Sequence, residues 1–119
     1  MARGRAVGVD LGASAIKVAL VDSDGGIVTR ARHALAVTEP AAVLAQIARA
    51  ASEVAGGRLS GPVGIAVPGV LDDERAVVTV AANLGWTDVP VREPLMAALG
   101  VPVVCEKDGA AAAPRACSA

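Results

Sequence analysis

The sequence predicts an α/β domain with a mixed sheet and flanking helices, and two observations lead to this prediction. Short runs of β-branched and aliphatic residues, bounded by glycine, proline, serine and aspartate, alternate with longer segments whose apolar residues recur at helical spacing. Three of the short runs precede the first helical segment, which favours antiparallel strands followed by parallel ones. At 119 residues, the chain has the length of one domain.

Three strands are expected at the start of the chain. They run from about Ala6 to Leu11, from about Ile16 to Asp22, and from Ile27 to Leu35. Ser23–Gly26 separates the second strand from the third and consists of turn-forming residues. The three strands should therefore form an antiparallel meander.

The first helix is expected after Thr38. Thr38 is a candidate N-cap, Pro40 is favourable in the first turn, and Gly56-Gly57 ends the helix. The apolar residues at helical spacing are Val43, Leu44, Ile47, Ala48, Ala51 and Val54.

An inner parallel strand should follow the helix. The run 62–70 is too short for a buried helix and is rich in β-branched residues, so we expect a strand that ends at Pro68-Gly69. An acidic loop then leads to a short extended piece from Ala76 to Val80.

A second helix and a last strand are expected in the final third of the chain. Asp88 is a candidate N-cap for a helix that ends near Leu99. Pro94 would remove a backbone hydrogen bond within that helix, so the helix should start late or kink. The last strand is expected at Val101–Glu106, with Asp108 at its carboxyl end before an alanine-rich helix.

Composition and charge restrict the class of protein. Hydrophobic residues make up 54% of the chain, yet 27 residues are alanine and Trp86 is the only aromatic residue, so we expect marginal stability. The net charge of −1 without a basic stripe argues against a nucleic-acid or anionic membrane partner.

No segment has the roughly 20 apolar residues needed to cross a bilayer. Cys105 and Cys117 have neither metal-ligand spacing nor the number typical of a disulfide scaffold, so the cytoplasm is the expected location.

The expected order of elements places several polar or turn-forming residues at one edge of the sheet. Three strands, a helix, a strand, a helix and a strand are the order of a ribonuclease-H-like domain, in which ligands bind at the carboxyl ends of parallel strands. Asp10, Pro68-Gly69 and Asp108 all lie at such ends. We therefore expect a binding site at this edge.

The turn after the first strand has the chemistry of a phosphate site. Asp10 can hold Mg²⁺ and its waters against a phosphate, Ser14 can donate its hydroxyl, and Lys17 supplies a cation. The small residues Gly12-Ala13-Ser14 leave backbone N–H groups accessible. The alternative is that Gly12 only makes a tight turn and that Asp10 and Lys17 are a solvated pair, because a short glycine motif is common.

Four motifs carry a resemblance to a known family. Residues 8–14, Gly-Val-Asp-Leu-Gly-Ala-Ser, together with Lys17 resemble the first phosphate loop of the actin-like ATPase superfamily. Pro68-Gly69, the stretch Asn-Leu-Gly-Trp-Thr-Asp-Val-Pro at 83–90 and Glu-Lys-Asp at 106–108 resemble ROK-family sugar kinases, bacterial glucokinases above all. The resemblance runs from about residue 7 to residue 113, and several motifs in the right order are more specific than any one of them.

The resemblance implies transfer of the γ-phosphoryl group of ATP to a hexose hydroxyl, usually the one on carbon six. Asp108 would be the general base, Asp10 would organise Mg²⁺, and Gly12-Ala13-Ser14 with Lys17 would bind the phosphates. The residues implied in sugar binding are Pro68, Gly69, Asn83, Glu106 and Lys107.

Each of these roles has a structural alternative. Asp108 could cap the last helix and Asn83 could hold a turn. For Asp108 we favour catalysis. Trp86 lies within the resembling stretch, but as the only large aromatic residue we expect it to pack in the core.

The chain departs from the family pattern at several points. The family usually has asparagine at the positions of Lys107 and Ala110, and it continues through a second, longer domain. We therefore interpret residues 1–113 as an N-terminal kinase lobe and residues 114–119 as a divergent tail, and we expect this fragment alone to be inactive. Two alternatives stay open: the sugar-sensing domain of a ROK-type transcriptional regulator, and a non-catalytic remnant that binds a partner. Self-association into a homo-oligomer is compatible with each of them.

Overall fold

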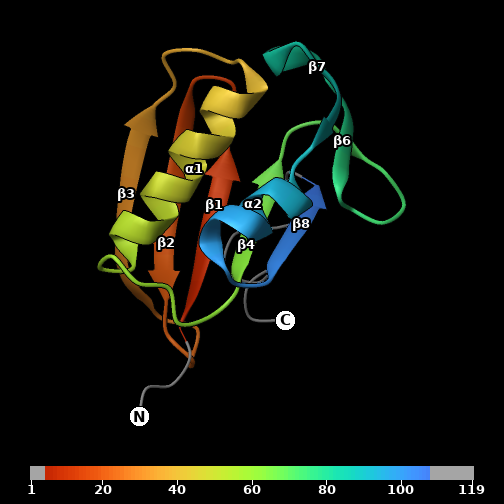
Figure 1. The fold of residues 1–119 in the computed structure, drawn as a ribbon. Helices are drawn as coiled ribbons and strands as arrows, with labels where there is room; N and C mark the ends of the chain where they lie inside the picture. The colour runs from red at the N-terminus through yellow and green to blue at the C-terminus, as the bar shows by residue number, and fades with distance from the viewer. Residues whose placement is uncertain (1–4, 108–119) are drawn as a thin grey trace.

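A computed structural model describes residues 5–107 of the chain. It contains two sheets, with both α-helices on one face of the larger sheet (Figure 1). The elements in chain order are β1 Ala6–Leu11, β2 Ala15–Val21, β3 Ile27–Ala34, α1 Pro40–Val54, β4 Val63–Val67, β5 Val70–Leu71, β6 Val77–Ala81, η1 Ala82–Leu84, β7 Trp86–Pro90, α2 Arg92–Leu99 and β8 Val103–Lys107.

The larger sheet has five strands in the order β3-β2-β1-β4-β8. Strands β1, β2 and β3 form the predicted antiparallel meander, and β4 and β8 extend the sheet in parallel with β1. The sheet is therefore mixed, and the carboxyl ends of β1, β4 and β8 lie at one edge, the upper edge in Figure 1. The predicted α/β class is confirmed.

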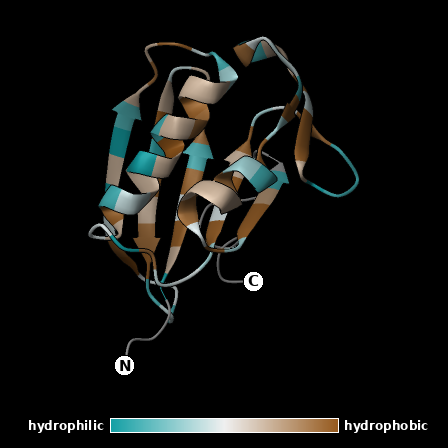
Figure 2. Ribbon diagram, in the orientation of Figure 1, coloured by the Kyte–Doolittle hydropathy of each residue, from teal (hydrophilic) through white to brown (hydrophobic). Residues whose placement is uncertain are grey.

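The main core lies between the helices and one face of this sheet. Helix α1 buries Val43, Ile47, Ala50 and Ala51 against the sheet, and α2 adds Leu95. The strands contribute β-branched side chains that alternate with residues of the opposite face, such as Val7 and Val9 in β1. Figure 2 shows the central strands as largely hydrophobic, whereas α1 alternates between hydrophobic and hydrophilic patches. This is the pattern of an amphipathic helix on a sheet.

The predicted starts of both helices need correction. The residue before α1 is Glu39, which makes no side-chain cap bond; Pro40 is the first helical residue, as expected, but Thr38 is not the N-cap. Asp88 does not cap α2 either, because it lies within β7 with a φ of 53°. Helix α2 begins only at Arg92, so Pro94 falls in its first turn and no internal kink is needed.

A second sheet, β5-β6-β7, packs beside the first and was only partly predicted. Its middle strand matches the extended piece expected at Ala76 to Val80 to within one residue, but β5 and β7 were not expected as strands. The last strand, β8, begins at Val103 rather than Val101. The expected alanine-rich helix and the divergent tail lie outside the described residues. Between residues 5 and 107, no helix is long and apolar enough to cross a membrane.

Candidate functional site

The strand register brings several of the predicted site residues into one row across the sheet. Asp10 in β1 lies opposite Lys17 in β2 on one side and Ala66 in β4 on the other, and Ala66 lies opposite Glu106 in β8. Paired residues project from the same face of a sheet. Val9 and Leu11 point into the helix-covered core, so Asp10 and its row project from the other face. Asp10 and Lys17 are exposed, and Glu106 is half-buried.

The turn between β1 and β2 offers fewer backbone donors than expected. The Gly12 N–H donates to the Ala15 carbonyl oxygen at 2.9 Å, which closes the turn, and the Ser14 carbonyl accepts the Leu35 N–H at 2.9 Å. Within the described part of the chain, no atom accepts a hydrogen bond from the N–H of Ala13 or Ser14 or from the Ser14 hydroxyl. Ala13 and Ser14 are also exposed. The N–H groups of Ala13 and Ser14 and the Ser14 hydroxyl are therefore available for an anion. The N–H of Gly12 is not available, because it is used within the turn.

Asp10 fits a role beside a hydrated magnesium ion. Its exposed carboxylate forms neither an ion pair nor a hydrogen bond with any residue from 5 to 107. No group of three or more histidine, cysteine or acidic residues gathers around it in that range. Magnesium characteristically keeps several waters and binds one or two carboxylates together with substrate phosphates. The Asp10 carboxylate, which has no partner among residues 5–107 and lies next to the available N–H groups of the β1–β2 turn, meets that requirement.

The end of β4 runs into the smaller sheet through Pro68 and Gly69. Gly69 has a φ of 117°, and a Cβ atom there would clash with the Val80 carbonyl of β6. Glycine is therefore needed at this position for the close approach of two backbones. Its structural role is established by this geometry, whereas the predicted contact of Pro68 and Gly69 with sugar stays a prediction.

Asn83 lies in the short helix η1, which joins β6 to β7, and Trp86 is the first residue of β7. The two side chains differ in environment. Asn83 is exposed in η1, and its side chain makes no hydrogen bond to a described residue. Trp86 is only 2% exposed, and its Nε1–H donates to the Thr38 carbonyl at 2.7 Å. The expected packing role of Trp86 is confirmed, and the Asn83 amide remains free to bind a ligand.

The carboxylate of Glu106 has a partner that the sequence did not reveal. Its Oε1 accepts from Nη1 of Arg75 at 2.6 Å, in an ion pair between β8 and the turn that joins β5 to β6. Arg75 occupies the left-handed region with a φ of 57°. One Glu106 oxygen is therefore held by the smaller sheet, and the other can serve a ligand.

The turn that presents Arg75 is stabilised by Asp72. Oδ1 of Asp72 accepts the N–H groups of Ala76 and Val77 at 2.8 and 3.1 Å. These bonds favour the ionised carboxylate and lower the pKa of Asp72 below its ordinary value of 3.8. An aspartate at a turn is a sequence signal for this local motif, but nothing local indicates that the arginine reaches β8.

Cys105 and Lys107 are the other two residues near the end of β8. Cys105 is buried on the core side, and burial raises the pKa of its thiol to about 11. It is therefore protonated at neutral pH and unsuited to nucleophilic chemistry. Lys107 is the last residue of β8, and the predicted base Asp108 lies outside the described residues.

The fold is that of a ribonuclease-H-like domain with its candidate site at the carboxyl edge of the parallel strands, and comparison with known proteins identifies the family. The ROK family model matches residues 6–115, so the chain belongs to the ROK family. It is 34% identical over 110 residues to a glucokinase of Streptomyces coelicolor, which covers 92% of this chain and 34% of that protein.

A solved structure and a second curated relative extend the comparison. A ROK family glucokinase from Streptomyces griseus, crystallised with glucose and AMPPNP, has a TM-score of 0.78 and 32% identity over 87% of this chain and 33% of that one. A putative xylose repressor from a Caldicellulosiruptor species is 29% identical over 118 residues, 92% of this chain and 29% of the repressor. The chain thus spans about a third of the length of the curated relatives it matches. The predicted ribonuclease-H-like fold, that of the actin-like ATPases, is confirmed.

Proposed function

We propose that this chain forms the N-terminal lobe of a glucokinase-like ROK kinase, which transfers a phosphoryl group from ATP to a hexose hydroxyl. The observation that carries the proposal is the 34% identity to a glucokinase over 92% of the chain. It is supported by the location of Asp10, the β1–β2 turn and the ends of β4 and β8 at one edge of the sheet. In this proposal residues 1–113 are the lobe and residues 114–119 are a divergent tail.

The donor side of the site consists of β1, β2 and the turn between them. Bound ATP with Mg²⁺ supplies the phosphoryl group and its leaving group. Asp10 holds the hydrated ion, and the N–H groups of Ala13 and Ser14 with the Ser14 hydroxyl donate to phosphate oxygens. Lys17 adds a positive charge next to Asp10. Gly12 contributes by closing the turn rather than by donating to the nucleotide.

The acceptor side consists of Pro68 and Gly69 after β4, Asn83 in η1, and the residues 106–108 at the end of β8. Asp108 accepts the proton of the attacking sugar hydroxyl, and the exposed Asn83 amide both donates to and accepts from sugar hydroxyls. The Glu106 oxygen that Arg75 does not hold accepts from a further hydroxyl. Lys107 offers donors only, where the family usually has asparagine, so this lobe lacks one acceptor toward the sugar.

We expect the isolated chain to show no sugar phosphorylation above background. Phosphoryl transfer depends on positioning both substrates, and a lobe that spans about a third of its relatives supplies only part of that positioning. Formation of glucose 6-phosphate from ATP by the purified chain, with contaminating kinases excluded, would contradict this expectation.

The test of the catalytic roles is a chimera in which residues 1–113 replace the matching part of the Streptomyces coelicolor glucokinase. Asp108→Asn should lower kcat for glucose phosphorylation by roughly 10²- to 10⁴-fold, the usual contribution of a general base. Lys107→Asn combined with Ala110→Asn should raise kcat/KM, because the asparagines restore acceptors toward the sugar. Asp73→Asn, at an exposed carboxylate of the β5–β6 turn, is the matched control and should change neither parameter. If Asp108→Asn and the double change are both silent, this strand end is not the catalytic site.

The match to a putative repressor supports a second candidate, the sugar-binding part of a ROK-type regulator. A regulator needs sugar binding but not proton transfer. Binding of glucose by an otherwise folded chimera that turns over no substrate, and in which Asp108→Asn leaves affinity unchanged, would favour this candidate over the kinase.

A further inference from the structure

The backbone of Arg75 has a conformation that glycine adopts more easily. Its φ of 57° lies in the left-handed region, which disfavours residues with a Cβ atom. Its Nη1 donates to Oε1 of Glu106 at 2.6 Å, but 58% of the Arg75 side chain is exposed. An exposed ion pair of this kind usually contributes less to stability than a left-handed backbone costs. A stabilising role therefore does not account for the arginine.

The turn that carries Arg75 is held from two directions. The Arg75 N–H donates to the Asp72 carbonyl at 3.0 Å, and Oδ1 of Asp72 accepts the N–H groups of the two residues that follow Arg75. Nη1 of Arg92, at the start of α2, donates to the Glu74 carbonyl at 3.0 Å. The backbone on each side of Arg75 is therefore fixed to the domain, and its side chain extends from a well-defined position toward β8.

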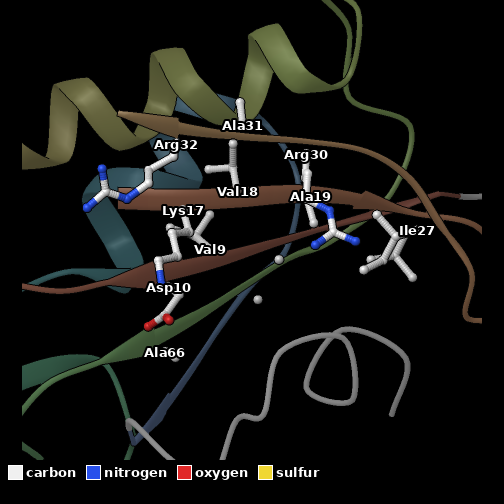
Figure 3. Close-up of a pocket in the computed structure, with 13 residues that line it drawn as sticks. Val9, Asp10, Lys17, Val18, Ala19, Ile27, Arg30, Ala31, Arg32 and Ala66 are labelled. Carbon is white, nitrogen blue, oxygen red and sulfur yellow. The ribbon is translucent and has the colours of Figure 1, made fainter. Parts of the chain in front are cut away.

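The residue that Arg75 holds, Glu106, lies in the same row of the sheet as Asp10. Ala66 separates the two, because it is paired with Asp10 on one side and with Glu106 on the other. Figure 3 shows the Asp10 carboxylate next to Ala66. Two strand spacings amount to about 10 Å, and only the methyl group of Ala66 lies between the two carboxylates in this row. A sugar hydroxyl bound at Glu106 would therefore be near a phosphate bound beside Asp10.

Only one oxygen of the Glu106 carboxylate is used by Arg75. The other oxygen, Oε2, has no partner among residues 5–107, and 25% of the side chain is exposed. Glutamate has a long and flexible side chain, and fixing it before a ligand binds reduces the entropy that binding must remove. An ionised carboxylate accepts hydrogen bonds at both oxygens. Glu106 is therefore a preorganised acceptor with one oxygen left for a ligand.

We infer that Arg75 is a positioning residue for the acceptor sugar: it fixes the Glu106 carboxylate so that Oε2 accepts from a sugar hydroxyl. The inference rests on the proposed function, because it takes a hexose as the ligand at this edge of the sheet. Arg75 acts through Glu106 and takes no part in the proton transfer assigned to Asp108. Loss of the Arg75 side chain should therefore change the KM for the sugar, but neither kcat nor the KM for ATP.

The kinetic test uses the chimera in which residues 1–113 replace the matching part of the Streptomyces coelicolor glucokinase. Arg75→Met should raise the KM for glucose by about two- to tenfold, the usual effect of having to order one flexible side chain on binding. Arg75→Lys keeps a cation and should restore part of the loss. The matched control is Arg58→Met, at an exposed position after α1 that forms no ion pair with a described residue, and it should leave the KM unchanged. An unchanged KM for glucose in an active Arg75→Met chimera would overturn the inference.

Arg75→Gly separates positioning from a purely structural role. Glycine adopts a φ of 57° without strain, so the unfolding midpoint of this variant should stay unchanged or rise, while its KM for glucose rises as in Arg75→Met. A purely structural arginine predicts the opposite, a lower midpoint with an unchanged KM. Glu106→Gln should also raise the KM, and adding Arg75→Met to it should raise the KM no further, because the carboxylate that Arg75 positions is then absent. Independent, multiplying effects of the two changes would overturn the inference.

Glucose binding decides the matter if the folded chimera does not phosphorylate glucose. Inactivity alone contradicts the proposed kinase function, whereas the affinity for glucose, measured by calorimetry, still reports on the role of Arg75. An affinity about two- to tenfold weaker in Arg75→Met than in the unmodified chimera would support the inference. Equal affinities in the two proteins, or no binding of glucose by either, would overturn it.

Discussion

The two sheets of this domain reach regular structure by different means. The five-stranded sheet is built from alternating β-branched residues, and its strands pair in register apart from one shift near Leu20. The three-stranded sheet depends on unusual backbone conformations: Gly69, Arg75 and Asp88 all have positive φ, and the β5–β6 pairing is shifted between Val70 and Leu71. The larger sheet is thus determined mainly by local pattern, and the smaller one by turns and by contacts with the rest of the domain.

Beside the apolar packing of residues such as Val78 and Val89 in the common core, three side-chain hydrogen bonds join the smaller sheet to the rest of the domain. Trp86 donates to Thr38 ahead of α1, and Arg75 pairs with Glu106 on β8. Arg92 at the start of α2 donates through Nη1 to the Glu74 carbonyl at 3.0 Å. Each bond joins residues that are distant in sequence, so disrupting one should loosen the smaller sheet without unfolding the larger.

The largest effect is expected in the centre of the larger sheet. Ile65 lies in β4 between β1 and β8 and is fully buried. Ile65→Ala should lower the free energy of unfolding by about 2–5 kcal/mol, since it removes buried methyl groups and leaves a cavity. Urea unfolding followed by circular dichroism measures this. Val104→Ala, at an exposed position of β8, should cost far less, and similar losses at both sites would show that β4 is not central to the core.

The next effect is expected where the two sheets join. Gly69→Ala introduces a Cβ atom that clashes with the Val80 carbonyl in a strained backbone conformation, so a loss of about 1–3 kcal/mol is expected. Gly25 has a φ of 91° but open space around it, so Gly25→Ala measures the conformational strain alone. If Gly69→Ala costs no more than Gly25→Ala, the close approach of β6 does not constrain the end of β4.

A smaller effect is expected for the ion pair that links the sheets. A double-mutant cycle with Arg75→Gln and Glu106→Gln should give a coupling free energy of about 0.2–1 kcal/mol, because Arg75 is largely exposed. The coupling should decrease as salt is added. A coupling near zero at low salt would mean that Glu106 is not held by the smaller sheet in solution.

The smallest effect concerns pH. The N–H groups of Ala76 and Val77 keep the pKa of Asp72 lower in the folded chain than in the unfolded chain. Its stabilising contribution is therefore complete above the unfolded value of 3.8 and is lost as pH falls through the lower folded value. Asp72→Asn should lower the thermal midpoint at neutral pH and flatten its acid dependence. The Asp73 side chain accepts neither of these N–H groups, so Asp73→Asn should leave the acid dependence of the thermal midpoint unchanged.

The sequence predicted the larger sheet well because its signals are local. Alternating apolar residues define β1 and β2, and proline and glycine bound α1 at Pro40 and Gly56. The strand β7 was missed because it contains Asp88 and ends at Pro90, residues that are rare in strands, and because its pairing with β6 is a tertiary contact. Residue type alone favours Asp88 as a helix cap, whereas the structure places it within β7.

The candidate site also has some features that follow from local sequence and others that depend on tertiary contacts. The Asp10 carboxylate and the β1–β2 turn were predicted from adjacent residues, and the structure places them at the expected edge. The engagement of the Gly12 N–H and the pairing of Glu106 with Arg75 were not predicted, since they depend on backbone geometry and on partners 31 residues apart. The row of small residues Ala19, Gly8 and Gly64 could not be recognised without the sheet order, because its members come from three separate strands.

Trp86 gives the protein an intrinsic optical reporter. The chain has one tryptophan and neither tyrosine nor phenylalanine, so ultraviolet-excited emission from aromatic side chains comes from a single indole. That indole is buried where β7 begins and is bonded to the carbonyl that precedes α1. Separation of the smaller sheet from the start of α1 would expose the ring to water and shift its emission to longer wavelength. Fluorescence therefore records opening at this junction without any added label.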